Sequence, residues 1–129
     1  SDATTDENPI TLSTADVETS NATDAVGFAY TGGGTADWKA VSVMGGADGT
    51  VTRCNTGGAT TPAVGTWQTF KVVINEDGDA DFYINGIFQY REDAAVTAAT
   101  LLCLAAALQS GGTARSLDID YVEIIAGRV

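Results

Sequence analysis

Three carboxylates near the end of the sequence are the residues best suited by type to acid–base chemistry. Asp118, Asp120 and Glu123 fall in the stretch L-D-I-D-Y-V-E-I, residues 117–124. Paired carboxylates cleave glycosidic bonds when they flank the scissile bond from one site. Side chains alternate between the two faces of a strand, so Asp118 and Asp120 share a face whereas Glu123 points to the other. The spacing therefore predicts the polar outer face of a strand and no catalytic set.

A second acidic group has the spacing of a cation-binding loop. Asp77, Asp79 and Asp81 occupy every second position, as the first ligands of an EF-hand calcium loop do. That loop also needs Gly at its sixth position and Glu at its twelfth, and here those positions are Phe82 and Phe88. We therefore predict a solvated hairpin turn, with weak Ca²⁺ binding as the alternative and no other cofactor.

Aromatic side chains offer flat surfaces on which a sugar ring can stack, and the candidates are Tyr30, Trp38, Tyr83 and Tyr90. Large aromatic residues of a small domain are mostly buried, so we expect Trp38 and Trp67 in the core. Tyr83 shares a predicted strand face with Asp81 and Asn85, which makes it the best exposed candidate. The predicted ligand contacts are Tyr83, Asn85 and Tyr90.

Composition excludes several function classes. Lys and Arg number 6 against 17 Asp and Glu, a formal charge of -11, which repels nucleic-acid phosphates and anionic lipid surfaces. Histidine is absent, which removes Ser-His-Asp and Cys-His catalysis and the commonest metal ligand. The longest apolar run, Leu101–Leu108, is far shorter than the roughly 20 residues that cross a bilayer. We expect a protein that is not an enzyme and binds neither nucleic acid nor membrane.

The two cysteines leave two interpretations open. Cys54 and Cys103 lie far apart in the sequence and form no C-x-x-C pair. They could be joined by a single disulfide in an oxidising compartment. Two small buried thiols are the favoured interpretation.

Alternating apolar residues predict an all-β antiparallel sandwich of about nine short strands. The expected strands cover residues 10–13, 25–30, 38–44, 50–54, 67–74, 80–85, the residues after Gly86, 101–108 and 117–125. Acidic-Gly and Asn-Gly turns precede residues 80 and 87. Leu and Ala in 101–108 favour helix, but we predict a buried strand there. We expect Leu117, Ile119 and Tyr121 to face the core.

Three stretches resemble one known superfamily. They are T-W-Q-T-F-K-V-V-I-N-E-D-G-D-A-D-F-Y-I-N-G-I (66–87), L-D-I-D-Y-V-E-I (117–124) and D-A-V-G-F-A-Y (24–30). The first resembles the central hairpins of concanavalin A-like lectin/glucanase (laminin G-like) jelly rolls. The other two are similar to the closing strand and the first core strand of such domains in structural proteins of tailed bacteriophages. The resemblance covers residues 24–125.

The resemblance implies a jelly roll and two candidate functions. The chain length fits one domain, which we place at residues 9–129 after a polar arm at residues 1–8. The first expected function is that of a virion structural protein at the particle surface, decorating a capsid or forming part of a tail or fibre. Its expected partners are other virion proteins and further copies of itself. The alternative is a lectin-like module that binds a glycan.

Overall fold

The computed structural model describes residues 10–13, 15, 18–32, 35–58, 61–104, 106 and 116–125. Within these ranges the chain forms nine strands and no helix. The strands are β1 (Ile10–Leu12), β2 (Glu18–Ser20), β3 (Ala25–Ala29), β4 (Lys39–Met44), β5 (Ala47–Asp48), β6 (Thr52–Arg53), β7 (Phe70–Ile74), β8 (Ala80–Ile84) and β9 (Ile87–Glu92). The described part of the chain therefore also holds no helix long and apolar enough to cross a membrane.

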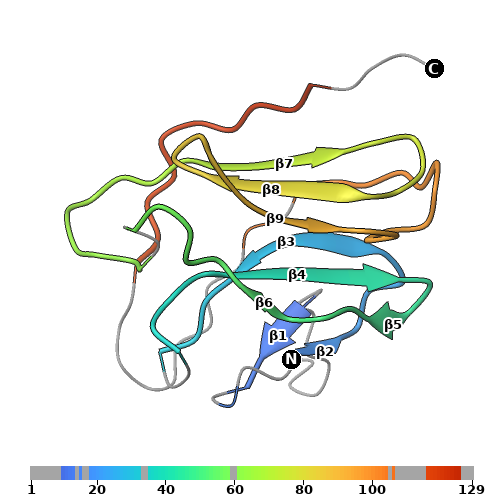
Figure 1. The fold of residues 1–129 in the computed structure, drawn as a ribbon, viewed down its shortest axis with the longest axis horizontal. Coiled ribbons are helices and arrows are strands. Elements are labelled where there is room, and N and C mark those ends of the chain that lie inside the picture. The colour runs from blue at the N-terminus through green and yellow to red at the C-terminus, as the bar shows by residue number, and fades with distance from the viewer. Residues whose placement is uncertain are drawn as a thin grey trace, which may run out of the picture.

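Every strand pair is antiparallel, and the pairs build three sheets. Strands β3, β4 and β5 follow one another across the largest sheet, and β6 also pairs with β4. Strands β7, β8 and β9 form the second sheet, which lies above β3 and β4 in Figure 1. The small β1–β2 hairpin lies below β4 in that view and contacts β3 and β5.

The core fills the space between the two larger sheets. Phe82 of β8 is fully buried, and its ring meets Phe28 of β3 edge-on at a centroid distance of 5.4 Å. Phe28 also packs on Phe70 of β7 at 5.1 Å. The buried cluster consists of Ala40, Cys54, Ala80, Phe82, Ile84 and Ala95. Two antiparallel sheets that bury apolar side chains between them are consistent with the predicted β-sandwich.

Strand β4 is buried on both of its faces from Lys39 to Val43. Ala40 belongs to the core between the sheets. Val41 and Val43 point to the opposite face and are also buried. Lys39, on the Val41 face, is buried as well, and its ammonium group donates hydrogen bonds to the carbonyls of Thr35 (2.8 Å) and Asp37 (2.7 Å).

Two hairpin turns have the conformations that their sequences predict. At the β7–β8 turn, Gly78 has a φ of +89°, and the side-chain oxygen of Asn75 accepts hydrogen bonds from the backbone N–H groups of Asp77 and Asp79. At the β8–β9 turn, Asn85 and Gly86 have φ values of 52° and 77°. Positive φ at both central residues is what a tight Asn-Gly hairpin requires.

Two predicted strands are wrong. In 101–108 the described residues, 101–104 and 106, form no strand, and Leu101 is 99% exposed; residues 105, 107 and 108 lie outside the described part. Residues 117–125 are also exposed and unpaired, including Leu117, Ile119 and Tyr121. Apolar alternation forms a strand only when a sheet edge pairs with it, and neither segment has such a partner among the described residues.

Two short strands went unpredicted, and one prediction lies outside the described residues. Strands β2 and β5 carry no apolar alternation, because they hold mostly polar or small residues. The predicted arm at residues 1–8 falls outside the part of the chain that the structure describes.

Candidate functional site

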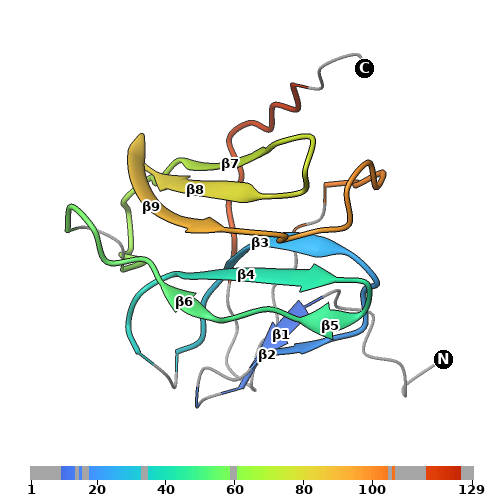
Figure 2. The same cartoon turned by 45° about the vertical axis from the view of Figure 1, so that its right-hand side comes forward.

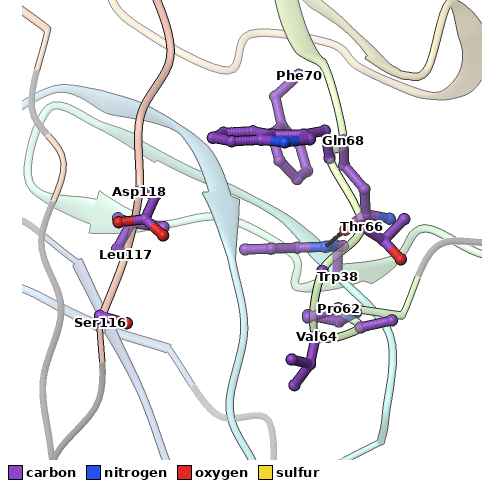
Figure 3. A pocket seen from close by; sticks show the side chains of 12 residues that line it. Trp38, Pro62, Val64, Thr66, Gln68, Phe70, Ser116, Leu117 and Asp118 are labelled. Atoms are coloured by element: carbon purple, nitrogen blue, oxygen red, sulfur yellow. Dashed lines mark hydrogen bonds between the residues drawn. The ribbon is translucent and has the colours of Figure 1, made fainter.

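An aromatic groove of about 410 Å³ lies between the segment that leads into β7 and residues 116–118. Figure 3 shows Trp38, Gln68 and Phe70 on one side of this groove and Ser116, Leu117 and Asp118 on a separate segment opposite. The lining residues are Trp38, Pro62, Ala63, Val64, Gly65, Thr66, Trp67, Gln68, Phe70, Ser116, Leu117 and Asp118. The volume lies in the range of small-molecule sites.

Contacts among the aromatic residues fix the inner wall of the groove. The rings of Trp38 and Phe70 meet edge-on with centroids 4.7 Å apart. Tyr30 also packs on Trp38, with ring centroids 5.6 Å apart. The indole N–H of Trp38 donates a hydrogen bond to Oε1 of Gln68 at 3.0 Å. Trp38 therefore has its ring position set by packing and its polar atom satisfied.

A tight turn before β7 presents the outer aromatic residue. The N–H of Thr66 donates to the carbonyl of Ala63 at 3.2 Å, and Gly65 has a φ of +73°, which a residue with a side chain adopts only with strain. Trp67 follows this turn and is 67% exposed. The prediction that Trp67 belongs to the core is therefore wrong, whereas Trp38 does pack against the core. The Pro and Gly residues before Trp67 are the sequence feature that indicates a loop there.

The opposite side of the groove supplies hydrogen-bonding groups. Ser116 and Asp118 are exposed there, whereas Asp120 and Glu123 do not line the groove. Aromatic faces beside a carboxylate and a hydroxyl suit a ligand with a flat apolar face and hydroxyl groups at its edge.

The structure does not bring the predicted ligand residues Tyr83, Asn85 and Tyr90 together. Tyr83 lies in the register opposite Lys71, whose ammonium sits 5.2 Å from the centre of its ring. Tyr90 points to the other face of the same sheet, where it stacks on Phe82 and packs against the core. Asn85 is a turn residue: its side-chain oxygen accepts a hydrogen bond from the N–H of Thr69 at 2.9 Å.

Two of the three aspartates of the possible calcium loop, Asp79 and Asp81, have side-chain partners in the protein. Asp79 accepts hydrogen bonds from the N–H of Ala94 and the side-chain amide of Asn75, which lower its pKa. Asp81 forms an ion pair with Arg91 at 2.8 Å, and Asp77 lies in the exposed β7–β8 turn. Among the described residues, no group of three or more potential ligands has the geometry to hold a metal ion.

The carboxyl group with the most perturbed titration lies away from the groove. Glu18 of β2 is buried, and both of its carboxylate oxygens lack a hydrogen-bond partner. Burial, with smaller contributions from the charges of Asp48 and Glu92, raises its pKa to about 7. A buried carboxyl with such a pKa has the acidity of a general acid, but Glu18 is not among the residues that line the groove.

The two cysteines differ in environment and are not bridged. Cys54 is buried in the core cluster, and burial raises the pKa of its thiol to about 11. Cys103 is exposed, so the prediction of two buried thiols is correct for Cys54 only. Both cysteines are free.

Comparison with known proteins places this chain in no family. No protein-family model, no curated protein and no solved structure matches the sequence or the fold. The proposals below therefore rest on the residues and geometry of this chain and on the resemblance of its motifs.

Proposed function

We propose that this chain is a non-enzymatic structural protein of a bacteriophage virion, a concanavalin A-like jelly-roll module. It sits at the particle surface, as a capsid decoration or as part of a tail or fibre, and is held there by protein–protein contacts. The observation that carries the proposal is the number of large apolar residues exposed along the C-terminal segment. Its exposed large apolar residues are Leu117, Ile119, Tyr121, Val122, Ile124 and Ile125.

Exposure on this scale supports a role in association. Single apolar side chains are common on protein surfaces, but a contiguous set of large ones marks a surface that another chain covers. Leu101, Leu102 and Leu104 add further exposed apolar groups. Burying these groups against neighbouring subunits would release the free energy that holds the module on a particle.

The charge of the chain favours contacts with proteins over contacts with the nucleic acid inside a virion. A formal charge of -11 repels phosphate groups and favours an outer position, with contacts to neutral or basic protein surfaces. The resemblance of residues 24–30 and 117–124 to phage structural domains points in the same direction.

The test is to locate the protein in purified virions. Gradient-purified particles from the source that encodes this sequence should contain the chain at tens to hundreds of copies by quantitative mass spectrometry. Gold-labelled antibodies raised against the purified domain should then mark the particle surface in electron micrographs. Recovery of the chain only in the soluble fraction, with none in the particles, contradicts the proposal.

A second function, glycan binding by a lectin-like module, is favoured by one specific observation. Trp67 is strongly exposed beside Trp38 and Phe70 in a groove that also holds Asp118. Stacking of a sugar ring on an exposed indole with hydrogen bonds at its rim is a common arrangement for carbohydrate recognition.

A glycan array read with and without Ca²⁺ tests this second function. We expect binding that Trp67→Ala reduces at least tenfold and that Ca²⁺ leaves unchanged, since Asp79 and Asp81 have protein partners. The matched control is Phe88→Ala, which removes another exposed aromatic residue outside the groove lining. A flat array response from the unmodified protein removes the glycan-binding function.

A further inference from the structure

We propose that residues 117–125 of one copy of this chain form a β-strand on the free edge of β7 in a second copy, and that the exchange is reciprocal. This inference rests on the proposed assembly function and names its first partner, a second copy of the chain. An unpaired strand edge, an unpaired apolar segment and the match between their side chains support this exchange.

Strand β7 has one open edge. It pairs with β8 over Phe70–Ile74, and no described residue pairs with its other side. Phe70 and Ile74 share the face of Val72, which points to the core, yet they remain 41% and 39% exposed. Core-facing residues of a strand keep such exposure when the neighbouring strand is missing.

The C-terminal segment has the sequence of a strand but no partner. Its apolar residues alternate with acidic ones over residues 117–121, and its described side chains are all exposed. In Figure 2 the red trace of this segment passes β7 and then rises away from its own sheets. Figure 1 also shows it beyond β7, on the outer side of the molecule. The segment is therefore unpaired and accessible to a neighbouring molecule.

An antiparallel register matches the two strands residue by residue. With Val72 opposite Ile119, the core-facing pairs become Phe70 with Tyr121 and Ile74 with Leu117. All three pairs are apolar, as the inner face of a sandwich requires. Glu123 lies on the same face of the incoming strand and falls opposite Gln68, beyond the end of β7.

The same register also pairs opposite charges on the outer face. Lys71 of β7 stands opposite Asp120 of the incoming strand. The ammonium of Lys71 already lies on that outer face, 5.2 Å from the ring centre of Tyr83. A cross-strand pair of opposite charge stabilises a sheet, whereas two like charges destabilise it. The charge pair is therefore compatible with the register of the apolar pairs.

Reciprocal exchange closes the assembly at two chains. Each copy supplies one edge and one strand, so a twofold axis satisfies both contacts and leaves neither edge open. Strand addition of this kind combines backbone hydrogen bonds with side-chain pockets at alternate positions. Such a dimer would cover the two features that the described monomer leaves exposed.

Charge reversal at the Lys71–Asp120 pair tests the register. In sedimentation-velocity runs of the full chain across a concentration series, we expect Lys71→Glu and Asp120→Lys each to weaken self-association at least tenfold. The double variant restores the pair in reverse and should recover most of the loss. The control, Asp77→Lys, changes an exposed turn carboxylate away from the edge and should dimerise like the unmodified protein.

The segment could instead pair with β7 of its own chain. A carbodiimide crosslink in a mixture of ¹⁴N- and ¹⁵N-labelled protein distinguishes exchange between two chains from such pairing within one chain. This reagent condenses the Lys71 amine with the Asp120 carboxylate to an amide with loss of water. Mixed-isotope Lys71–Asp120 peptides support the exchange. A monomer at millimolar concentration, or a crosslink only within one isotope, overturns it. This test uses purified protein alone, so it is independent of the virion experiment. Absence of the chain from virions would contradict the proposed function but not the exchanged dimer.

Discussion

Trp38 donates its indole N–H to Oε1 of Gln68 over 3.0 Å, a hydrogen bond that joins the residue before β4 to the segment before β7. These two segments belong to different sheets, so the bond ties the sheets together at the groove. The edge-on contact of Trp38 with Phe70 at 4.7 Å lies beside it. The ligand groove and the junction of the two sheets are therefore the same structural feature.

Removal of this hydrogen bond should destabilise the domain. Gln68→Leu leaves the partly buried Trp38 N–H without its acceptor, which we expect to cost about 1–2 kcal/mol of unfolding free energy. Trp38→Phe/Gln68→Leu removes both partners, so the two single losses should not add. Urea unfolding of the four proteins in a double-mutant cycle measures the coupling, and strict additivity within error would show that the bond contributes nothing.

A side chain at Gly78 would clash with a neighbouring loop, whereas a side chain at Gly58 would meet open space. A Cβ at Gly78 would lie 2.2 Å from the carbonyl oxygen of Val96, whereas at Gly58 nothing lies within 4 Å, and both residues have positive φ. We expect Gly58→Ala to cost about 1 kcal/mol from backbone strain alone and Gly78→Ala to cost roughly 3 kcal/mol or more. Thermal unfolding compares them. Equal losses would show that the Val96 loop gives way.

The hairpins of the second sheet were predictable because their determinants are local. Asn75 and Gly78 set one turn, Asn85 and Gly86 the next, and the alternation of Ala80 to Ile84 places Phe82 inside. Each of these features needs only neighbouring residues, so the sequence contains all the information that the turn geometry uses.

The groove and the C-terminal region were not predictable because they depend on pairing between distant segments. Apolar alternation at Leu117–Tyr121 shows that a segment suits a sheet, but not which edge it joins or in which chain. Trp67 and Trp38 are the same type of residue, so residue type alone predicts burial for both. The turn at Gly65 leaves Trp67 exposed. The negative charge and the absence of histidine exclude several classes of function, but they do not indicate where a ligand binds.

The core contribution of Phe82 can be measured against a residue of the same type on the same sheet. Phe82 is fully buried between Phe28 and Tyr90, so Phe82→Ala should cost about 3–5 kcal/mol through lost burial and a new cavity. Phe88 of β9 is 47% exposed and meets only Tyr83 edge-on among the ring contacts, so Phe88→Ala should cost about 1 kcal/mol. Chemical unfolding gives both values. A loss for Phe82→Ala no larger than that for Phe88→Ala would mean that the core lies elsewhere.

Glu18 should make the stability of the domain fall as the pH rises from about 4.5 to about 7. Its pKa is raised from 4.5 to about 7, first by burial and then by the charges of Asp48 and Glu92. Between these two pKa values the unfolded chain has lost the proton and the folded chain retains it, so the free energy of unfolding decreases with increasing pH. Above about pH 7 the full penalty applies, roughly 3 kcal/mol for a shift of this size.

Glu18→Gln removes this penalty and should reveal it by its pH dependence. We expect the variant to be more stable than the unmodified protein at pH 8 and close to it at pH 4, where Glu18 is protonated in both the folded and the unfolded chain. The control is Glu76→Gln in the exposed β7–β8 turn, which makes the same change of net charge. Urea unfolding at pH 4, 6 and 8 compares the three proteins. Two results would contradict this explanation. One is a stabilisation by Glu18→Gln that is equal at pH 4 and pH 8, and the other is an equal stabilisation by Glu76→Gln. Either would show that the stabilisation does not come from removing a buried Glu18 carboxylate.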